Sequence, residues 1–222
     1  SCRRSSPCGP DVQLGGSRPP TARSTTEDGT VASLGHRATR AAVVLAAGGG
    51  TRWEGDGHKL LAELDGRPVV AHALAAAAEA GLDELVVVTG AVDLSAVIPA
   101  GATVLHNTRW AEGQAVSLHL ALTHAAVAGH DAVVVGLADS PGVPAEAWRA
   151  VASVDAVLAV ATFGGNRRPP TLIGRSLWGD LPETGDEGAR VLLADRSDLV
   201  VEVPCPGDPA DVDTMEDLQR WR

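Results

Sequence analysis

The sequence predicts an α/β fold built around a largely parallel sheet. From Ala41 onward, short apolar runs alternate with longer alanine-rich amphipathic segments, which is typical of β-α-β units. The first apolar run ends in three consecutive glycines, and a later run ends in Asp139. In a parallel α/β sheet, ligands lie beyond the carboxyl ends of the strands, so both features are expected at the functional edge.

Each predicted element follows from this alternation. The short apolar runs are expected to be strands, at 42–47, 84–89, 103–106, 132–138, 157–162, 171–173 and 199–203. The amphipathic segments between them are expected to be helices, at 69–80, 114–128, 144–151, 187–194 and 215–221. Thr214 stands before the last helix and Asp217 follows three residues later, a spacing that resembles a capping box.

Length and composition favour one globular domain with a tail. The chain has 222 residues, of which 45% are hydrophobic and 21% charged, enough for one sizeable core. The net charge of −10 argues against a broad nucleic-acid surface. No apolar run is long enough to span a bilayer and no apolar leader is visible, so we expect no membrane contact and a cytoplasmic location. The three cysteines form no CxxC pair, which argues against a disulfide framework or a zinc site.

Residues 1–38 are expected to form a disordered N-terminal extension. They are rich in Ser, Gly, Pro and Arg and show no apolar periodicity. Such a segment cannot bury enough apolar surface to offset the entropy lost on ordering. The globular domain is therefore expected to cover residues 39–222.

The first candidate site is the segment LAAGGGTRWEGDGHK, residues 45–59. Glycines allow backbone N–H groups to surround a phosphate because no Cβ obstructs the approach. Arg52 and Lys59 add positive charge suited to a triphosphate. The segment matches neither GxGxxG nor GxxxxGK[ST]. The residues alone favour an anion-binding loop and leave open an ordinary tight turn with solvated cations.

Two acidic segments are candidates for a metal site. Asp139 ends an apolar strand, and a lone carboxylate there suits Mg²⁺, which prefers hard oxygen ligands. An N-cap or turn aspartate explains Asp139 equally well. Asp211 and Asp213 alternate in DPADVDT, so an extended chain would point both to the same face. Taken alone, these two residues are more typical of a helix start.

Histidines and tryptophans give weaker signals. His119 and His124 are five residues apart, which differs from the i, i+4 spacing of two ligands on one helix face. His58 lies beside Lys59, where it would either touch phosphate or face solvent. Trp53 and Trp110 are expected to pack under loops, and a position beside the cleft is the alternative.

In their order along the chain, these segments resemble the MobA-like nucleotidyltransferases, and most closely the molybdenum cofactor cytidylyltransferase group. The glycine segment is similar to that group's LAAGxSxRMG pattern followed by Lys, with Gly50 and Trp53 departing from it. NTRWAEGQAVSLHLAL resembles an Asn followed by EGMxxSLxxGL, with Gln114 in place of Met. The resemblance covers residues 41–222, so residues 39–222 would form a MobA-like NTP transferase domain.

Four further segments carry the resemblance. LADSPGV is similar to GDMPxV and retains Asp139 and Pro141, while Ala138 and Ser140 differ. GNRRPPTLIG resembles the G-x-P-x-L/F segment. TGDEGARVLL and DVDTMEDL are close to GDxGARxLL and DIDTPEDL. Each match is modest, but the ordered set is specific.

The resemblance implies a Rossmann-like three-layer sandwich with a mostly parallel sheet, and a nucleoside triphosphate bound by the first loop. The implied catalytic residues are Arg52, Lys59 and Asp139, with Mg²⁺ held by Asp139 and Asp213. The nucleotide-binding residues implied in the same way are Leu45, Ala46, Ala47, Gly48, Gly49, Gly50, Asn107 and Ser117.

The resemblance also implies the substrates. Members with LAAG tend to take CTP, so Ala47 favours CTP, with GTP as the alternative. The acceptor would be the terminal phosphate of a molybdopterin cofactor, and the TGDEGAR region is associated with it. Candidate acceptor contacts are therefore Asp186, Gly188 and Arg190, together with Arg167 and Arg168. A molybdoenzyme or its chaperone is the implied protein partner.

Two alternatives stay open. The first is guanylyl transfer, or nucleotidyl transfer to another phosphorylated acceptor such as a sugar phosphate. The second is a non-catalytic nucleotide-binding partner in molybdoenzyme maturation, which the departures at Gly50, Trp53 and Ala138 keep open. The complete set of Arg52, Lys59 and the two aspartates argues against this second alternative, because a carrier needs no such set.

Overall fold

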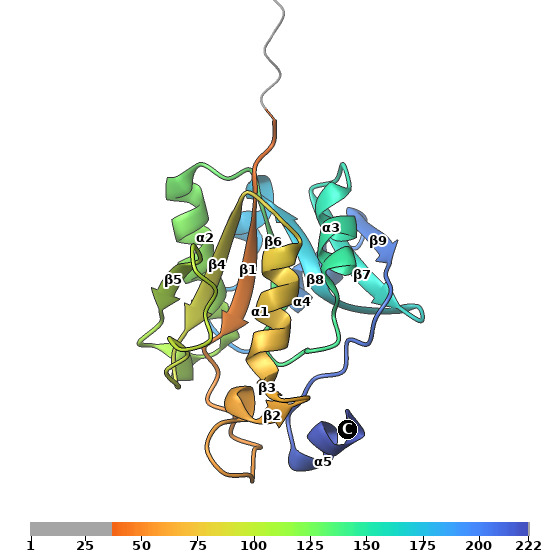
Figure 1. Cartoon of the computed structure of the whole chain (residues 1–222). Helices are drawn as coiled ribbons and strands as arrows, with labels where there is room; N and C mark the ends of the chain where they lie inside the picture. Colours follow the sequence, from red (N-terminus) through yellow and green to blue (C-terminus); the bar gives the residue numbers. More distant parts are fainter. Residues whose placement is uncertain (1–36, 222) are drawn as a thin grey trace, which may run out of the picture. The chain divides into compact units, whose positions relative to one another are not determined.

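A computed structural model describes residues 37–221 and shows a seven-stranded sheet covered by helices on both faces (Figure 1). The strand order is β5-β4-β1-β6-β8-β7-β9. The strands are β1 (Arg40–Ala46), β4 (Glu84–Thr89), β5 (Thr103–His106), β6 (Ala132–Leu137), β7 (Leu158–Phe163), β8 (Asn166–Gly174) and β9 (Val200–Pro204). Only β8 pairs antiparallel with its neighbours, so the sheet is mostly parallel as predicted.

Four helices complete the three layers. They are α1 (Val69–Glu79), α2 (Gln114–Ala128), α3 (Ala145–Ser153) and α4 (Ala189–Asp195). Helices α1 and α3 pack on one face of the sheet, and α2 and α4 pack on the other (Figure 1). This is the Rossmann-like three-layer sandwich that the sequence predicts.

The central strand β1 shows why these residues form a sheet with two covered faces. Ala42, Val44 and Ala46 belong to the core beneath α1 and α3, and the alternate residues Ala41, Val43 and Leu45 belong to the core beneath α2 and α4. A strand buried on both faces requires a continuous apolar sequence, as in this run.

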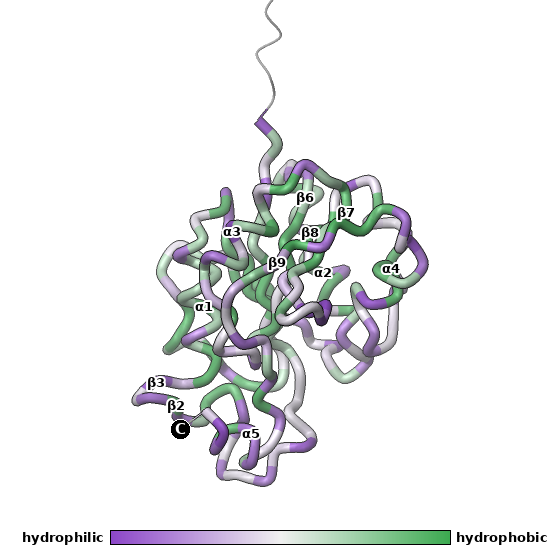
Figure 2. The backbone as a smooth tube through the Cα atoms, turned by 90° about the vertical axis from the view of Figure 1, so that its right-hand side faces the viewer, coloured by the Kyte–Doolittle hydropathy of each residue, from purple (hydrophilic) through white to green (hydrophobic). Residues whose placement is uncertain are grey.

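A third apolar cluster joins the carboxyl-terminal segment to the region after the glycines. Its buried members are Leu64, Val69, Val212 and Leu218. Trp53 and Trp221 pack against it. Helix α5 (Met215–Arg220) and the short strands β2 (Glu63–Leu64) and β3 (Arg67–Pro68) lie at the same end of the sheet (Figure 2). Helix α5 therefore packs beside the residues that follow the glycine loop.

The predicted capping box is confirmed. The Asp217 N–H donates to Thr214 Oγ1 at 3.1 Å, and the Thr214 N–H donates to Asp217 Oδ2 at 2.9 Å. These two bonds satisfy backbone donors that have no partner within the helix.

Two predictions on the elements need correction, and one element was not predicted. The strand expected at 171–173 is the second half of a nine-residue antiparallel strand, β8, whose exposed first half carries Arg167 and Arg168. The helix expected from 187 begins at Ala189, because Gly188 has φ 48° and ψ −126°, outside the helical region. The β2-β3 hairpin was not predicted, although Asp65 and Gly66 both adopt the positive φ that an Asp-Gly turn requires.

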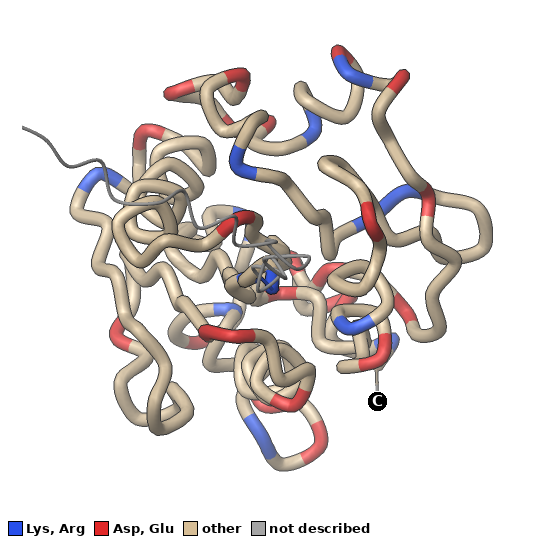
Figure 3. Tube along the Cα trace, turned by 90° about the horizontal axis from the view of Figure 1, so that it is seen from above, with Lys and Arg blue, Asp and Glu red and all other residues tan. Residues whose placement is uncertain are grey.

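Other predictions concern the surface and the ends of the chain. No helix within residues 37–221 is both long and apolar enough to cross a bilayer. Basic and acidic residues are interspersed along the trace (Figure 3). The predicted N-terminal extension lies outside the described residues except for Arg37 and Ala38, which are exposed.

Candidate active site

The glycine loop leaves the carboxyl end of β1 at the middle of the sheet. The Ala91 N–H donates to the Ala47 carbonyl oxygen at 3.1 Å, which anchors the start of the loop to the segment after β4. Gly50 has φ 60°, a conformation that favours glycine. Within the described residues, the N–H groups of Gly48, Gly49 and Gly50 donate no hydrogen bond. The loop therefore presents unused amide donors at the functional edge of the sheet.

The ring of Trp110 leaves no room for a side chain at Gly49. A Cβ at Gly49 would lie 2.6 Å from Cζ3 of Trp110, closer than atoms in van der Waals contact allow. A Cβ at the neighbouring Gly90 would lie 2.7 Å from the Ala47 carbonyl oxygen. Trp110 comes from the short helix η2 (Trp110–Glu112) and packs against the loop, as the sequence predicts. The path of the loop is thus held by close packing on one side.

His58 holds the other side of the loop. Its Nδ1 accepts a 3.2 Å hydrogen bond from the Leu60 N–H, so its Nε2 carries the proton and donates to the Gly48 carbonyl oxygen at 3.0 Å. Burial lowers the pKa of His58, the bond to Gly48 partly opposes this, and the charge of Lys59 lowers the pKa further. The neutral ring therefore braces the glycine loop.

Lys59 lies at the centre of the site. Its Nζ is 2.6 Å from Asp139 Oδ2 and 2.7 Å from Asp213 Oδ1, and its side chain is only 11% exposed. Burial lowers the pKa of Lys59, but the charges and hydrogen bonds of Asp139 and Asp213 outweigh it and raise the pKa overall. The buried ammonium therefore stays charged and joins the two carboxylates.

Arg52 completes the group of residues that the sequence singled out. Its Nη2 lies 2.9 Å from Asp213 Oδ2, and its side chain is 73% exposed. The structure thus brings together Arg52, Lys59, Asp139 and Asp213 from three separate segments of the chain. Because Arg52 reaches the group from solvent, its guanidinium is free to reorient toward an anion.

The two acidic segments run side by side. The Val212 N–H donates to the Asp139 carbonyl oxygen at 2.8 Å, and Ser140 Oγ donates to Asp211 Oδ1 at 2.6 Å. Burial raises the pKa of Asp211, and the charges of Asp139 and Asp213 raise it further. As the alternation predicts, Asp211 and Asp213 face the centre, while the buried Val212 between them joins the apolar cluster below.

The residues at this centre fit a divalent cation. Asp139 Oδ1 is buried and has no hydrogen-bond partner, so it is an unused hard oxygen ligand. Among the described residues, no three His, Cys, Asp or Glu side chains are grouped to hold a metal ion by themselves. Mg²⁺ does not require such a group, because it takes one or two carboxylates together with substrate phosphates. Asp139 and Asp213 would supply those two carboxylates.

Asn107 and Ser117 lie together but are turned inward. The Asn107 Nδ2 group donates to Ser117 Oγ at 2.9 Å, and Asn107 Oδ1 accepts from the Arg109 N–H at 2.8 Å. Both side chains are buried. In this structure, the pair fixes the connection between β5 and α2 rather than presenting free polar groups.

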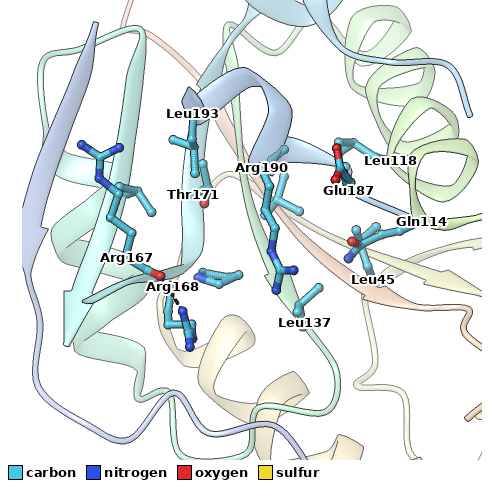
Figure 4. A pocket seen from close by; sticks show the side chains of 15 residues that line it. Leu45, Gln114, Leu118, Leu137, Arg167, Arg168, Thr171, Glu187, Arg190 and Leu193 are labelled. Atoms are coloured by element: carbon cyan, nitrogen blue, oxygen red, sulfur yellow. Dashed lines mark hydrogen bonds between the residues drawn. The ribbon is translucent and has the colours of Figure 1, made fainter. Parts of the chain in front are cut away.

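A pocket opens beside the ends of β1 and β6 (Figure 4). Its volume is about 80 Å³, and its apolar side includes Leu45, Leu118 and Leu137. The polar or charged residues that line it are Gln114, Arg167, Arg168, Thr171, Glu187 and Arg190. Because its volume is well below the roughly 300 Å³ of a small ligand site, it would hold part of a ligand.

The arginines of this pocket differ in their partners. Arg167 Nη2 lies 2.8 Å from Glu202 Oε1, and Arg168 Nη1 donates to the Arg167 carbonyl oxygen at 3.1 Å. The Arg190 guanidinium has no hydrogen bond or ion pair among the described residues, and it extends across the pocket toward Leu137 (Figure 4). Arg190 is therefore the cation of this pocket that is available to a ligand.

The other predicted acceptor residues hold the edge of the pocket. Gly188 lines it, with a positive φ of 48°, whereas Asp186 does not line it and lies next to Gly113. A Cβ at Gly113 would come within 2.5 Å of the Gly185 carbonyl oxygen, and that oxygen accepts a hydrogen bond from the Ala115 N–H. The TGDEGAR segment is thus fastened to the start of α2.

A partly buried polar cluster at the opposite end of the sheet was not predicted from the sequence. Glu84, the first residue of β4, accepts hydrogen bonds from Thr103 at 2.6 Å and pairs with His124 at 2.8 Å and His130 at 2.7 Å. Burial raises the pKa of Glu84, but these hydrogen bonds outweigh it and lower the pKa to about 2. The cluster joins strands and helix far from the glycine loop, so its role is structural.

Comparisons with known proteins bear on the family and the fold of this chain. Residues 42–200 match the family described as the MobA-like NTP transferase domain. Among curated proteins, the bifunctional protein GlmU of Streptomyces coelicolor is 33% identical over 164 residues, which are 71% of this chain and 33% of that protein. The GlmU of Caulobacter vibrioides is 38% identical over 143 residues, 61% of this chain and 30% of that protein. The chain spans about a third of the length of these relatives.

Solved structures of other proteins have a fold similar to that of this chain. Rv0371c of Mycobacterium tuberculosis H37Rv superposes with a TM-score of 0.74 at 28% identity, covering 84% of this chain and 98% of that one. A complex of Rv0371c with manganese gives a TM-score of 0.70 at 27% identity, covering 82% of this chain and 97% of that one.

Proposed function

The chain belongs to the MobA-like NTP transferase family, and from that premise we propose that it transfers CMP from CTP to the phosphate of a molybdopterin-type acceptor and releases pyrophosphate. The observation that carries this proposal is the group formed by Lys59, Asp139 and Asp213 beside a loop of unused amides. The product would then pass to a molybdoenzyme or its chaperone.

The reaction needs position and charge rather than covalent catalysis. An oxygen of the acceptor phosphate attacks the α-phosphorus of CTP, and the bond from this phosphorus to the bridging oxygen of the β-phosphate breaks in line. The electron pair leaves with pyrophosphate. Because the attacking phosphate is already ionised near pH 7, no general base is required.

The glycine loop and the two cations would hold the triphosphate. The N–H groups of Gly48, Gly49 and Gly50 would donate to phosphate oxygens, and the exposed Arg52 would move from Asp213 onto the departing pyrophosphate. Lys59 would share its charge between the carboxylates and the phosphates. Asp139 and Asp213 would hold Mg²⁺, which supplies positive charge that neutralises the phosphates when bound. A structure of the similar protein Rv0371c in complex with manganese supports the use of a divalent ion.

The pocket beside β1 and β6 would receive the acceptor. Leu137, toward which Arg190 extends, lies two residues before Asp139, so Arg190 would direct the acceptor phosphate toward the reaction centre (Figure 4). Gly188 would allow the acceptor to approach the backbone closely, and Asp186 would act at the edge of the pocket. Arg167 and Arg168 would add positive charge at the rim.

Ligand-induced stabilisation tests the nucleotide. Each of the four ribonucleoside triphosphates would be added with Mg²⁺, and the shift of the unfolding temperature would be measured. We expect CTP to give the largest shift because the loop has Ala47; a larger shift with GTP would assign guanylyl transfer instead. Pyrophosphate release would then be measured with molybdopterin and with sugar phosphates as acceptors. Release with a sugar phosphate alone would overturn the proposed acceptor, and stabilisation by CTP without release from any acceptor would favour a non-catalytic binding protein.

A further inference from the structure

Ser140 and Asp211 lie next to the two carboxylates that would hold the divalent ion. Ser140 directly follows Asp139, and Asp211 lies two residues before Asp213. Ser140 is 5% exposed, and its Oγ donates a 2.6 Å hydrogen bond to Asp211 Oδ1. This bond connects the two acidic segments through their side chains.

Building on the proposed function, we propose that Ser140 and Asp211 form a positioning pair that fixes the spacing of Asp139 and Asp213 for the divalent ion. Neither residue would touch the ion or the substrates. Asp211 is assigned the positioning role because its Oδ1 accepts the hydrogen bond from the Ser140 hydroxyl, which joins the two acidic segments. The pair would act as the second layer around the ion, where hydrogen bonds orient the ligating carboxylates.

The other connections between the two segments explain why this pair is needed. Lys59 bridges Asp139 and Asp213, but it occupies an oxygen of each carboxylate and would compete with a divalent ion for them. With the ion bound, Lys59 would share its charge with the phosphates, and its bridge would set the spacing of the carboxylates less firmly. The Val212 N–H to Asp139 carbonyl bond then holds only the backbones together. Among residues 37–221, the Ser140 to Asp211 bond is the remaining direct hydrogen bond between side chains of the two acidic segments.

Repulsion between carboxylates is a second reason why the Ser140 to Asp211 bond is needed. Asp211 is partly buried, and its bond to Ser140 and its place two residues before Asp213 bring it near two like-charged carboxylates. Without the Ser140 hydroxyl, repulsion would favour a rotation of Asp211 away from the centre, and the extended segment that carries Asp213 would move with it. A methionine stands at the position of Ser140 in the pattern that the segment resembles, so the bond belongs to this chain's own version of the site.

The test is the affinity for Mn²⁺ in the presence of a CTP analogue with a methylene bridge between the α- and β-phosphorus, which cannot react. Bound Mn²⁺ would be measured by electron paramagnetic resonance for the wild type, Ser140→Ala and Ser140→Thr. We expect Ser140→Ala to bind Mn²⁺ about 10- to 100-fold more weakly, as for other changes around metal ligands, and Ser140→Thr to recover most of the loss. Ser153→Ala is the matched control, since the Ser153 hydroxyl donates to the Ala150 carbonyl oxygen on an exposed helix end.

Several outcomes would overturn the inference. One is a Mn²⁺ affinity of Ser140→Ala within twofold of the wild type. Another is an equal loss in Ser140→Ala and Ser140→Thr, because this would indicate packing rather than the hydroxyl. Nucleotide affinity in EDTA should be unchanged in Ser140→Ala, and a parallel loss there would show a general collapse of the site. If the wild type bound no nucleotide at all, the proposed function itself would fail, and this result is distinct from the others.

Discussion

The ammonium of Lys59 joins Asp139 and Asp213, which are 80 and 154 residues away from it in the sequence. The two distances, 2.6 and 2.7 Å, are nearly equal, so one buried cation balances two carboxylates that would otherwise repel each other. The same contacts explain how a site for a divalent ion stays folded without the ion.

Replacing Lys59 by glutamine should therefore lower stability and activity together. Removing one partner of a buried ion pair typically costs about 3–5 kcal/mol, because the other charges stay uncompensated. Without the ammonium, the carboxylates of Asp139 and Asp213 repel each other, so the stability of the variant should depend more on a bound divalent ion. We expect a lower unfolding temperature than the wild type in EDTA and a larger rise on adding Mg²⁺, measured by differential scanning calorimetry. An equal rise in both proteins would contradict the bridging role.

Asp139→Asn should abolish the Mg²⁺-dependent reaction while the fold is retained. Loss of one preorganised charge contact lowers a rate by about 10²- to 10³-fold, and loss of a metal ligand should reach at least this range. Pyrophosphate release would be measured over a range of Mg²⁺ concentrations, with circular dichroism to check the fold. Asp198→Asn is a suitable control because Asp198 is exposed and 3.9 Å from its partner Arg196. Near-normal turnover of Asp139→Asn would refute the metal assignment.

Arg190→Gln should affect the acceptor and spare the nucleotide. Its guanidinium has no other partner among the described residues and reaches into the pocket, so its removal should raise the KM for the acceptor about tenfold or more, given the 1.5–3 kcal/mol of a charged hydrogen bond. The KM for CTP should stay within about twofold. Steady-state kinetics with each substrate varied would separate the two, with Arg149→Gln on the exposed face of α3 as the control. A parallel rise in both KM values would place Arg190 on the nucleotide instead.

Much of the fold could be predicted from the sequence because the signals were local. The buried strand β1 has an uninterrupted apolar run, and Thr214 with Asp217 has the spacing of a capping box. The direction of β8 had no such signal. Its first half is exposed and includes Arg167 and Arg168, so only the buried segment 171–173 has the apolar pattern of a strand.

Site residues could be predicted where residue type and position in the sequence indicate their role. Contacts between residues far apart in the sequence could not be predicted in this way. Lys59 and Asp139 stand out by residue type and by their place after strands. The bridge that Lys59 makes, and the hydrogen bond from Ser140 to Asp211, join residues far apart in the sequence. The Glu84 cluster is similar, because His124 and His130 are 40 and 46 residues away from Glu84.

Glu84 should make the free energy of unfolding depend on pH in the acid range. The folded-state pKa of about 2 lies below the ordinary value of 4.5, so the contribution of Glu84 is complete above pH 4.5 and is lost as the pH falls toward 2. Glu84→Gln should cost about 1–3 kcal/mol at pH 7, because it replaces hydrogen bonds to a charged group. Urea unfolding at pH 7, 4 and 3 would show the difference between the two proteins shrinking as the pH falls. A difference that stays constant would contradict the pKa assignment.

Two neighbouring glycines offer a sharp test of the loop. A Cβ at Gly49 would lie 2.6 Å from the Trp110 ring, whereas a Cβ at Gly48 would meet no atom within 4 Å, and Gly48 has no positive φ. Gly49→Ala should therefore cost about 1–3 kcal/mol of stability by overpacking, and it should weaken CTP binding because the amides must shift. Gly48→Ala should leave stability within about 1 kcal/mol of the wild type, since alanine also restricts the unfolded chain. Calorimetric unfolding and CTP titration of both variants would check this. Gly48→Ala could lose CTP binding while its stability is kept. This result would mean that the added methyl group blocks the phosphate directly, so the backbone at Gly48 would lie against the ligand as the proposed reaction requires.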